Sequence, residues 1–277
     1  MILSERLIEG FGAELLEEEK SNATIEKYIR DVRAFWKYVK DGIVDKTIVL
    51  EFKRYLGESF APASANSMIA AVNAFLKFCN RPDLCVKQFR VQHQAFSTEE
   101  KELTKAEYIR LLNTAKAKKN ERLYLILQTI CGTGIRVSEL QYITVEAVHR
   151  GEANVDCKGK HRRIFIIPEL RKKLLKYIKE QKIIYGQVFV TKNGKAMSRS
   201  NIWREMKGLC KQANVPPTKV FPHNLRHLFA RTFYGIEKDI AKLADILGHS
   251  SINTTRIYIT TTSAEHKKRM QNLHLII

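Results

Sequence analysis

Apolar side chains recur at intervals of three and four residues along the first part of the chain, and this pattern predicts helices. Over 21–40 the large apolar residues fall on one helical face, whereas lysines and arginines occupy the opposite face. Further helices are expected at 45–57 and at 62–79, where Pro62 suits a first turn and several alanines permit close packing. We therefore expect the chain to begin with a small all-helical module.

Helical periodicity resumes after a less regular stretch at 81–102, which has the character of a linker. Thr104 and Glu107 form a predicted capping box for a helix over 103–117, and an apolar helix is expected to follow at 121–131. These signals mark the start of a second domain.

Short apolar segments then interrupt the helical pattern. Residues 153–157 and 162–168 have the composition of strands, and the basic turn KGKH between them predicts an antiparallel hairpin. The segment QVFV at 187–190 is a candidate third strand. From Ser198 onward the pattern is helical, with Gly235 and Gly248 as expected helix stops.

The predicted fold class is therefore mainly α, with a helical N-terminal domain and a mostly helical C-terminal domain that carries a small antiparallel sheet. We place the first domain at 1–93, a linker at 94–102 and the second domain at 103–277.

The net charge of +19 adds a functional indication because it is unevenly distributed. Residues 1–95 contain 14 Lys and Arg against 13 Asp and Glu, whereas residues 96–277 contain 34 against 16. Such an excess is typical of a surface that binds a polyanion, although it is also compatible with a basic protein kept soluble by lysines. Charge alone does not separate DNA from RNA or from an anionic membrane.

The composition excludes several classes of protein. No segment approaches the ~20 consecutive apolar residues of a membrane span, and the N-terminus is too acidic for a signal peptide. We therefore expect a cytoplasmic protein with no membrane partner. The five cysteines are scattered, and no Cys or His residues have ligand spacing, so we predict no metal site and no cofactor.

Four short motifs in the second part contain the groups needed to break a phosphodiester without a metal ion. A tyrosine hydroxyl can form a covalent ester with phosphorus. Arginines offer a planar fork to phosphate oxygens, and a lysine can donate a proton where nearby positive charge lowers its pKa. The motifs and their candidate residues are GTGIRVSEL with Arg136, CKGKHRR with Lys158, PHNLRH with His223 and Arg226, and LGHSSINTTRIY with His249 and Tyr258.

Each motif alone is weak. An isolated arginine is usually a surface charge, and an isolated tyrosine usually packs against its neighbours. The spacing of His223 and Arg226 places both on one face of a helix, but such a pair is frequent by chance. The occurrence of all four motifs in this order is far more specific.

In order and spacing these motifs resemble the tyrosine recombinase (phage integrase) family, over about residues 21–262. The resemblance implies a clamp in which a SAM-like helical core-binding domain and a catalytic domain cover opposite faces of a DNA duplex. It also implies roles for individual residues: Arg136 and Arg226 bind the scissile phosphate, Glu139 supports the site, Lys158 is the general acid, His223 accepts the tyrosine proton or orients the site, His249 hydrogen-bonds the phosphate, and Tyr258 becomes linked to a 3′ phosphate.

Two points in the hairpin turn stay open. Lys160 could reach the same phosphate as Lys158, so the assignment of the general acid depends on register with the family. Many relatives carry a glycine where this sequence has Cys157.

The resulting functional hypothesis is a site-specific DNA recombinase or integrase. The alternatives are a type IB topoisomerase-like enzyme and a DNA-binding protein of the same fold that lacks the chemistry. The expected partners are double-stranded DNA with specific recombination sites and further copies of the chain. The apolar end LHLII of the tail suggests a homo-tetramer on two sites, at the nucleoid. Candidate base-reading residues are Asn66, Arg199, Asn201 and Arg204.

Overall fold

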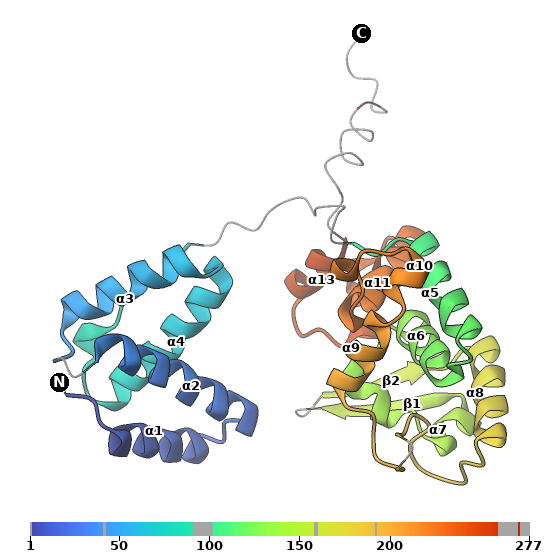
Figure 1. Cartoon of the computed structure of the whole chain (residues 1–277), viewed down its shortest axis with the longest axis horizontal. Helices are drawn as coiled ribbons and strands as arrows, with labels where there is room; N and C mark the ends of the chain where they lie inside the picture. Colours follow the sequence, from blue (N-terminus) through green and yellow to red (C-terminus); the bar gives the residue numbers. More distant parts are fainter. Residues whose placement is uncertain are drawn as a thin grey trace. The chain divides into compact units, whose positions relative to one another are not determined.

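The computed structural model describes residues 2–40, 43–90, 102–157, 160–191, 193–259 and 271, with only the backbone of Cys157, Lys160 and Ile259. Contacts divide the chain into two compact units, Met1–His93 and Gln94–Ile277 (Figure 1). The predicted linker at 94–102 lies outside the described residues, apart from Glu102.

The first unit is a helical bundle, and the helices predicted from periodicity are confirmed. Its elements are α1 (Glu5–Glu17), α2 (Asn22–Val39), α3 (Lys46–Ser59), α4 (Pro62–Phe78) and the 3₁₀ turn η1 (Pro82–Leu84). Phe11, Phe35 and Phe75 are buried in its core. The alanines Ala65 and Ala71 of α4 are fully buried, which agrees with close helix packing.

Two asparagines on α4 hold the extended segment that follows η1. Asn66 donates to the Phe89 carbonyl at 2.9 Å and accepts from the Phe89 amide at 2.7 Å. Asn73 makes the same pair of bonds with Val86, at 2.8 and 3.0 Å. The expectation that Asn66 reads a base is therefore wrong, because its carboxamide is used to satisfy backbone groups of its own unit.

The second unit is mainly helical with a single two-stranded sheet in its described part (Figure 1). Its elements are α5 (Lys105–Ala117), α6 (Glu121–Thr133), η3 (Val137–Tyr142), α7 (Val145–Arg150), β1 (Glu152–Cys157), β2 (Lys160–Phe165), α8 (Pro168–Glu180), α9 (Arg199–Lys207), α10 (Cys210–Ala213), η4 (Pro217–Lys219), α11 (Pro222–Glu237), α12 (Ile240–Leu247) and α13 (Ile252–Ile259). Helix α6 is buried among α5, α8 and α11. The capping box of Thr104 and Glu107 is confirmed.

The predicted hairpin is present and is antiparallel, with Val155 opposite Arg162 and Ala153 opposite Ile164. Because side chains alternate along a strand, these four residues share one face of the hairpin. Ala153, Val155 and Ile164 are buried, so this face points into the unit. Arg162 therefore enters the interior together with apolar neighbours.

The prediction was wrong about a third strand, about the end of the second strand and about one helix stop. The segment 187–190 forms only isolated bridges, Thr144 with Gln187 and Val190 with Ala196, because its apolar pattern reflects burial of Val188 and Phe189 and not ladder pairing. The second strand ends at Phe165, and Pro168 begins α8.

Gly235 does not stop a helix. Helix α11 runs through it to Glu237, and Lys238 ends the helix with φ of 54°. Gly248 does end α12, with φ of 65°, as predicted.

Within the described ranges, no helix combines the length and apolar composition that crossing a bilayer requires.

The asparagine clamps predict a local effect on stability. Asn73→Ala leaves the amide and carbonyl of Val86 without their partners, so the segment 85–90 should be destabilised by about 1–3 kcal/mol. Hydrogen exchange of the Val86 amide in the full chain should accelerate, whereas exchange in α6 should not change. Asn22→Ala alters an exposed asparagine and serves as the control. Unchanged exchange at Val86 would contradict this account.

Candidate active site

Arg136 is placed by a sharp change of direction at the end of α6. Gly134 ends this helix in the left-handed region, with φ of 68°. A Cβ at Gly134 would lie 2.5 Å from the ring of Phe229, so only glycine fits. Arg136 follows as the N-cap of η3, and its side chain is partly exposed. The chain therefore presents this guanidinium at a fixed point on the surface.

Glu139 holds both the backbone and the side chain of Arg136. Its Oε2 accepts from the Arg136 backbone amide at 2.7 Å, and its Oε1 accepts from Arg136 Nη1 at 2.9 Å. Oε2 also accepts from Arg162 Nη2. The Glu139 side chain is 4% exposed, so a buried carboxylate lies between two guanidinium groups. The supporting role predicted for Glu139 agrees with this geometry.

Arg226 of α11 is buried, with 1% of its surface exposed. Nη1 donates to the Gly134 carbonyl at 2.6 Å and Nη2 donates to the Leu247 carbonyl at 2.7 Å. Nε is buried and has no hydrogen-bond partner among the described residues. Burial and the charge of Arg136 lower the Arg226 pKa to about 10, so the group remains charged at neutral pH.

His249 lies directly after the turn at Gly248 and is held by both ring nitrogens. Nε2 is 3.0 Å from Arg226 Nη2, and Nδ1 is 2.8 Å from Thr255 Oγ1. A guanidinium can only donate, so Nε2 accepts and Nδ1 carries the proton. Burial and the charges of Arg226 and Arg136 lower the His249 pKa to about 4. The imidazole is therefore neutral near pH 7.

Tyr258 comes from α13 and is 6% exposed. Its ring stacks on His227 with centroids 4.2 Å apart and an interplanar angle of 26°. The rings of His249 and His223 are 5.2 and 5.3 Å away, and Arg226 Cζ lies 6.0 Å from the centroid. Contacts of α13 with α11 and α12 hold the tyrosine in this position.

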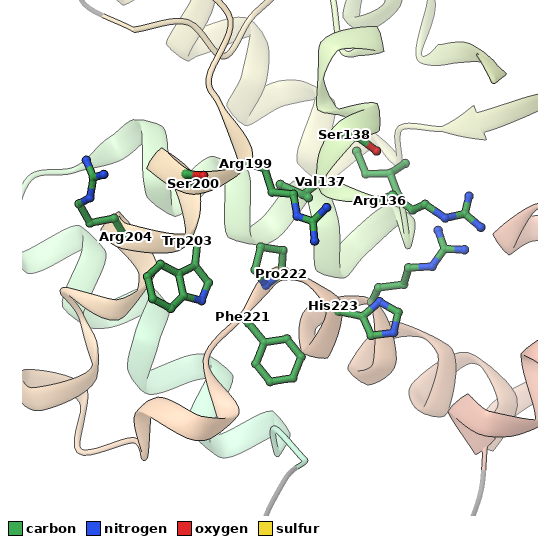
Figure 2. A pocket seen from close by; sticks show the side chains of 12 residues that line it. Arg136, Val137, Ser138, Arg199, Ser200, Trp203, Arg204, Phe221, Pro222 and His223 are labelled. Atoms are coloured by element: carbon green, nitrogen blue, oxygen red, sulfur yellow. The ribbon is translucent and has the colours of Figure 1, made fainter. Parts of the chain in front are cut away.

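A cavity of about 910 Å³ opens beside these groups. In Figure 2, Arg136 and His223 lie at one end, Trp203 and Phe221 at the other, and Arg199 between them. Partial burial of the His223 ring and the charges of Arg226, Arg136 and Arg199 lower its pKa, so this imidazole is also neutral near pH 7. The cavity thus offers several cations and one neutral imidazole to an anion.

The structure brings together all but one of the residues predicted for the site. The residues that gather are Arg136, Glu139, His223, Arg226, His249 and Tyr258. Lys158 lies outside the described residues, and so does the side chain of Lys160. The choice between the two lysines therefore stays open.

Sequence reasoning missed three residues that contact the site. His227 stacks on Tyr258, Thr255 holds His249, and Arg162 pairs with Glu139. His227 lies one helical turn after His223, and this spacing could have indicated a second histidine on the same face. No comparable signal marks Arg162, because its inward direction depends on the strand register.

Of the three residues of α9 that were expected to read bases, two line the cavity and one does not. Arg199 and Arg204 of α9 line the cavity, and Arg199 is close enough to His223 to influence its pKa. Asn201 does not line it. In the described part of the chain, no group of three or more His, Cys, Asp and Glu side chains is arranged to hold a metal ion.

Two family sequence models match the chain. The description "Phage integrase family" matches residues 101–265, and "Phage integrase, N-terminal SAM-like domain" matches residues 8–82. The tyrosine recombinase XerD of Halalkalibacterium halodurans is 30% identical over 284 residues, which cover 94% of this chain and 92% of the relative. The tyrosine recombinase XerA of Pyrococcus furiosus is 27% identical and covers 99% of this chain and 96% of its own.

Solved structures show the same fold at lower identity. XerH bound to palindromic difH substrate in a post-cleavage complex has a TM-score of 0.70 and 18% identity, covering 89% of this chain and 78% of that chain. A lambda integrase tetramer bound to a Holliday junction has a TM-score of 0.73 and 15% identity, covering 92% and 76%.

The neutral histidines predict that stability falls in acid. The folded state keeps His227 and His249 neutral down to about pH 4, whereas the unfolded chain takes up protons near the ordinary pKa of 6.5. The stabilisation is therefore complete above pH 6.5 and is lost between pH 6.5 and 4, with a slope of about one proton per histidine. Urea unfolding across this range measures it.

A variant and a control make this measurement specific. His227→Gln should reduce the pH dependence of unfolding, and His161→Gln, which changes an exposed histidine, should leave it unchanged. Equal slopes in the wild type and in His227→Gln would contradict the burial argument.

Proposed function

The chain belongs to the phage integrase family of tyrosine recombinases, and on this basis we propose that Tyr258 is the nucleophile with which it breaks and rejoins DNA. Its activity is site-specific recombination. The observation that supports this assignment is the contact of the Tyr258 ring with three histidines and its proximity to the buried Arg226. A packing tyrosine has no reason to be surrounded by such groups.

The scissile phosphate binds between Arg136 and Arg226 in this proposal. Arg226 lines the cavity and is fixed by carbonyls at two helix ends, so its guanidinium is already oriented before an anion arrives. Arg136 is anchored by Glu139 and still partly exposed. Both guanidinium groups therefore present oriented donors to the non-bridging oxygens.

Strand cleavage is an exchange of one phosphorus–oxygen bond for another. Tyr258 Oη bonds to phosphorus, the bond to the 5′ oxygen breaks, and the DNA 3′ phosphate remains on the tyrosine. His223 is neutral near pH 7 and close to the tyrosine, so it can accept the hydroxyl proton. Lys158 donates a proton to the departing 5′ oxygen, with Lys160 as the alternative donor.

Two alternative functions were considered, one with similar catalytic groups and one with the same fold. A type IB topoisomerase-like enzyme would cut and reseal one duplex, and a catalytically idle protein would only bind it. The relatives and structures compared above are recombinases and integrases. The presence of all six candidate groups in the sequence argues against an idle protein.

We further propose that the protein acts as a homo-tetramer on two recombination sites in double-stranded DNA. Lambda integrase, which shares the fold, forms a tetramer bound to a Holliday junction. The tail at 264–277 lies outside the described residues apart from Gln271, and its apolar end would contact a neighbouring subunit. We also propose an Xer-like role at the nucleoid, in the cytoplasm, which the similarity to XerD and XerA supports; movement of a mobile genetic element is the alternative.

Tyr258→Phe should abolish covalent attachment to DNA and change affinity by no more than about twofold, because it removes one oxygen and no charge. Gel retardation and trapping of the covalent adduct on one nicked duplex measure both quantities. Tyr185→Phe changes an exposed tyrosine outside the site and should retain wild-type trapping. A covalent adduct of the Tyr258→Phe protein would refute the nucleophile assignment.

Removal of residues 264–277 should preserve binding to a single site, since none of the proposed phosphate-binding residues is in the tail, but should impair synapsis of two sites. Light-scattering mass on one and on two sites, beside a recombination assay, tests this. Recombination at the wild-type rate by the shortened protein would place the subunit contact elsewhere.

A further inference from the structure

Arg162 connects the hairpin to two other parts of the catalytic unit. Its side chain is 10% exposed, and Nη1 donates to the Ile246 carbonyl in α12 at 2.9 Å. Nη2 pairs with Glu139. One planar guanidinium therefore contacts β2, α12 and η3 at the same time, which a lysine ammonium could not reproduce.

The space for this side chain is provided by a glycine. A Cβ at Gly248 would lie 2.6 Å from Arg162 Cδ, and Gly248 is also in the left-handed region with φ of 65°. His249 follows directly and binds Arg226. The turn that positions His249 therefore also leaves the space that the Arg162 side chain occupies.

Glu139 transmits the position of Arg162 to the phosphate clamp. Its carboxylate joins Arg162 on one side and Arg136 on the other. A buried carboxylate needs such compensation, and the pairing fixes both guanidinium groups relative to each other. Strand β2 is thereby held at a set distance from Arg136.

We propose that Arg162 is a positioning residue that locks the β1–β2 hairpin to Arg136, and so places the general-acid lysine of the hairpin turn beside the leaving oxygen. Lys158 precedes Arg162 by four residues, which corresponds to at most ~13 Å of extended chain. Fixing Arg162 therefore fixes the strand β2 that follows the lysine in the sequence. The inference rests on the proposed function, in which a lysine of this turn supplies the proton.

A purely structural role for Arg162 predicts a different outcome. If the residue only stabilises Glu139 and the fold, its loss slows cleavage of every substrate equally. If it positions the proton donor, its loss matters only when the leaving group needs a proton. A 5′-bridging sulfur substrate distinguishes the two, because the thiolate leaves without protonation when Tyr258 attacks phosphorus.

The experiment is single-turnover cleavage by the full chain at saturating protein, on matched oxygen and sulfur duplexes. Arg162→Ala should slow cleavage of the oxygen substrate by at least ~10-fold, because it misplaces a general acid whose full contribution is ~10²–10⁴-fold. On the sulfur substrate it should approach the wild-type rate. Arg162→Lys should slow cleavage of the oxygen substrate less than Arg162→Ala does, and the sulfur substrate should rescue it as well. Because this variant keeps a positive charge beside Glu139, it also serves as the test if the alanine variant unfolds.

Arg163→Ala is the matched control. Arg163 is the next residue in β2, its side chain is 61% exposed, and it pairs with Glu152 at 3.6 Å. This variant loses the same charge from the hairpin but none of the buried contacts, so its rates on both substrates should match the wild type. Arg136→Ala should remain slow on both.

The outcomes separate this inference from the proposed function. An Arg162 variant that is equally slow on both substrates overturns the positioning role, whether or not its thermal stability changes. Failure of the sulfur substrate to rescue Lys158→Ala or Lys160→Ala would instead refute the general-acid assignment. Lack of a covalent adduct with wild-type protein would refute the nucleolytic chemistry itself.

Discussion

The buried guanidinium of Arg226 is the interaction on which the catalytic unit depends. It donates to the carbonyls of Gly134 and Leu247, which lie at the C-terminal ends of α6 and α12. The last carbonyls of a helix lack intrahelical partners and carry its negative pole, so a cation there is favourable. One side chain therefore caps two helices and draws together the segments that carry Arg136 and His249.

This arrangement also determines the protonation of the site. The guanidinium groups of Arg226 and Arg136 lower the pKa values of the nearby imidazoles of His223 and His249, in addition to the effect of burial. The histidines can then lie among cations without adding to the repulsion. A site built this way holds positive charge in the arginines, which do not titrate near neutral pH, and keeps the imidazoles neutral.

The sequence contained enough information for many of the helices, the hairpin and most of the catalytic cluster, but not for the contacts between them, and the helices α1 and α8 were not predicted. Periodicity predicts a helix because burial selects one face, as in 21–40, and the motif order identified the groups around Tyr258. The same reasoning failed at 187–190, where buried apolar residues have no ladder partner, and at Gly235, which lies within α11. Asn66 and Arg162 have roles that depend on tertiary neighbours, which a local pattern does not record.

The two asparagine clamps of α4 determine where the N-terminal unit can be joined to the catalytic unit of another recombinase. Because Asn66 and Asn73 bind the backbone of Phe89 and Val86, the segment beyond η1 is part of the first unit. A chimaera joined directly after α4 would supply these carboxamides with a foreign segment. The junction belongs after residue 90, so that each helical module is transferred together with the extended segment that completes it.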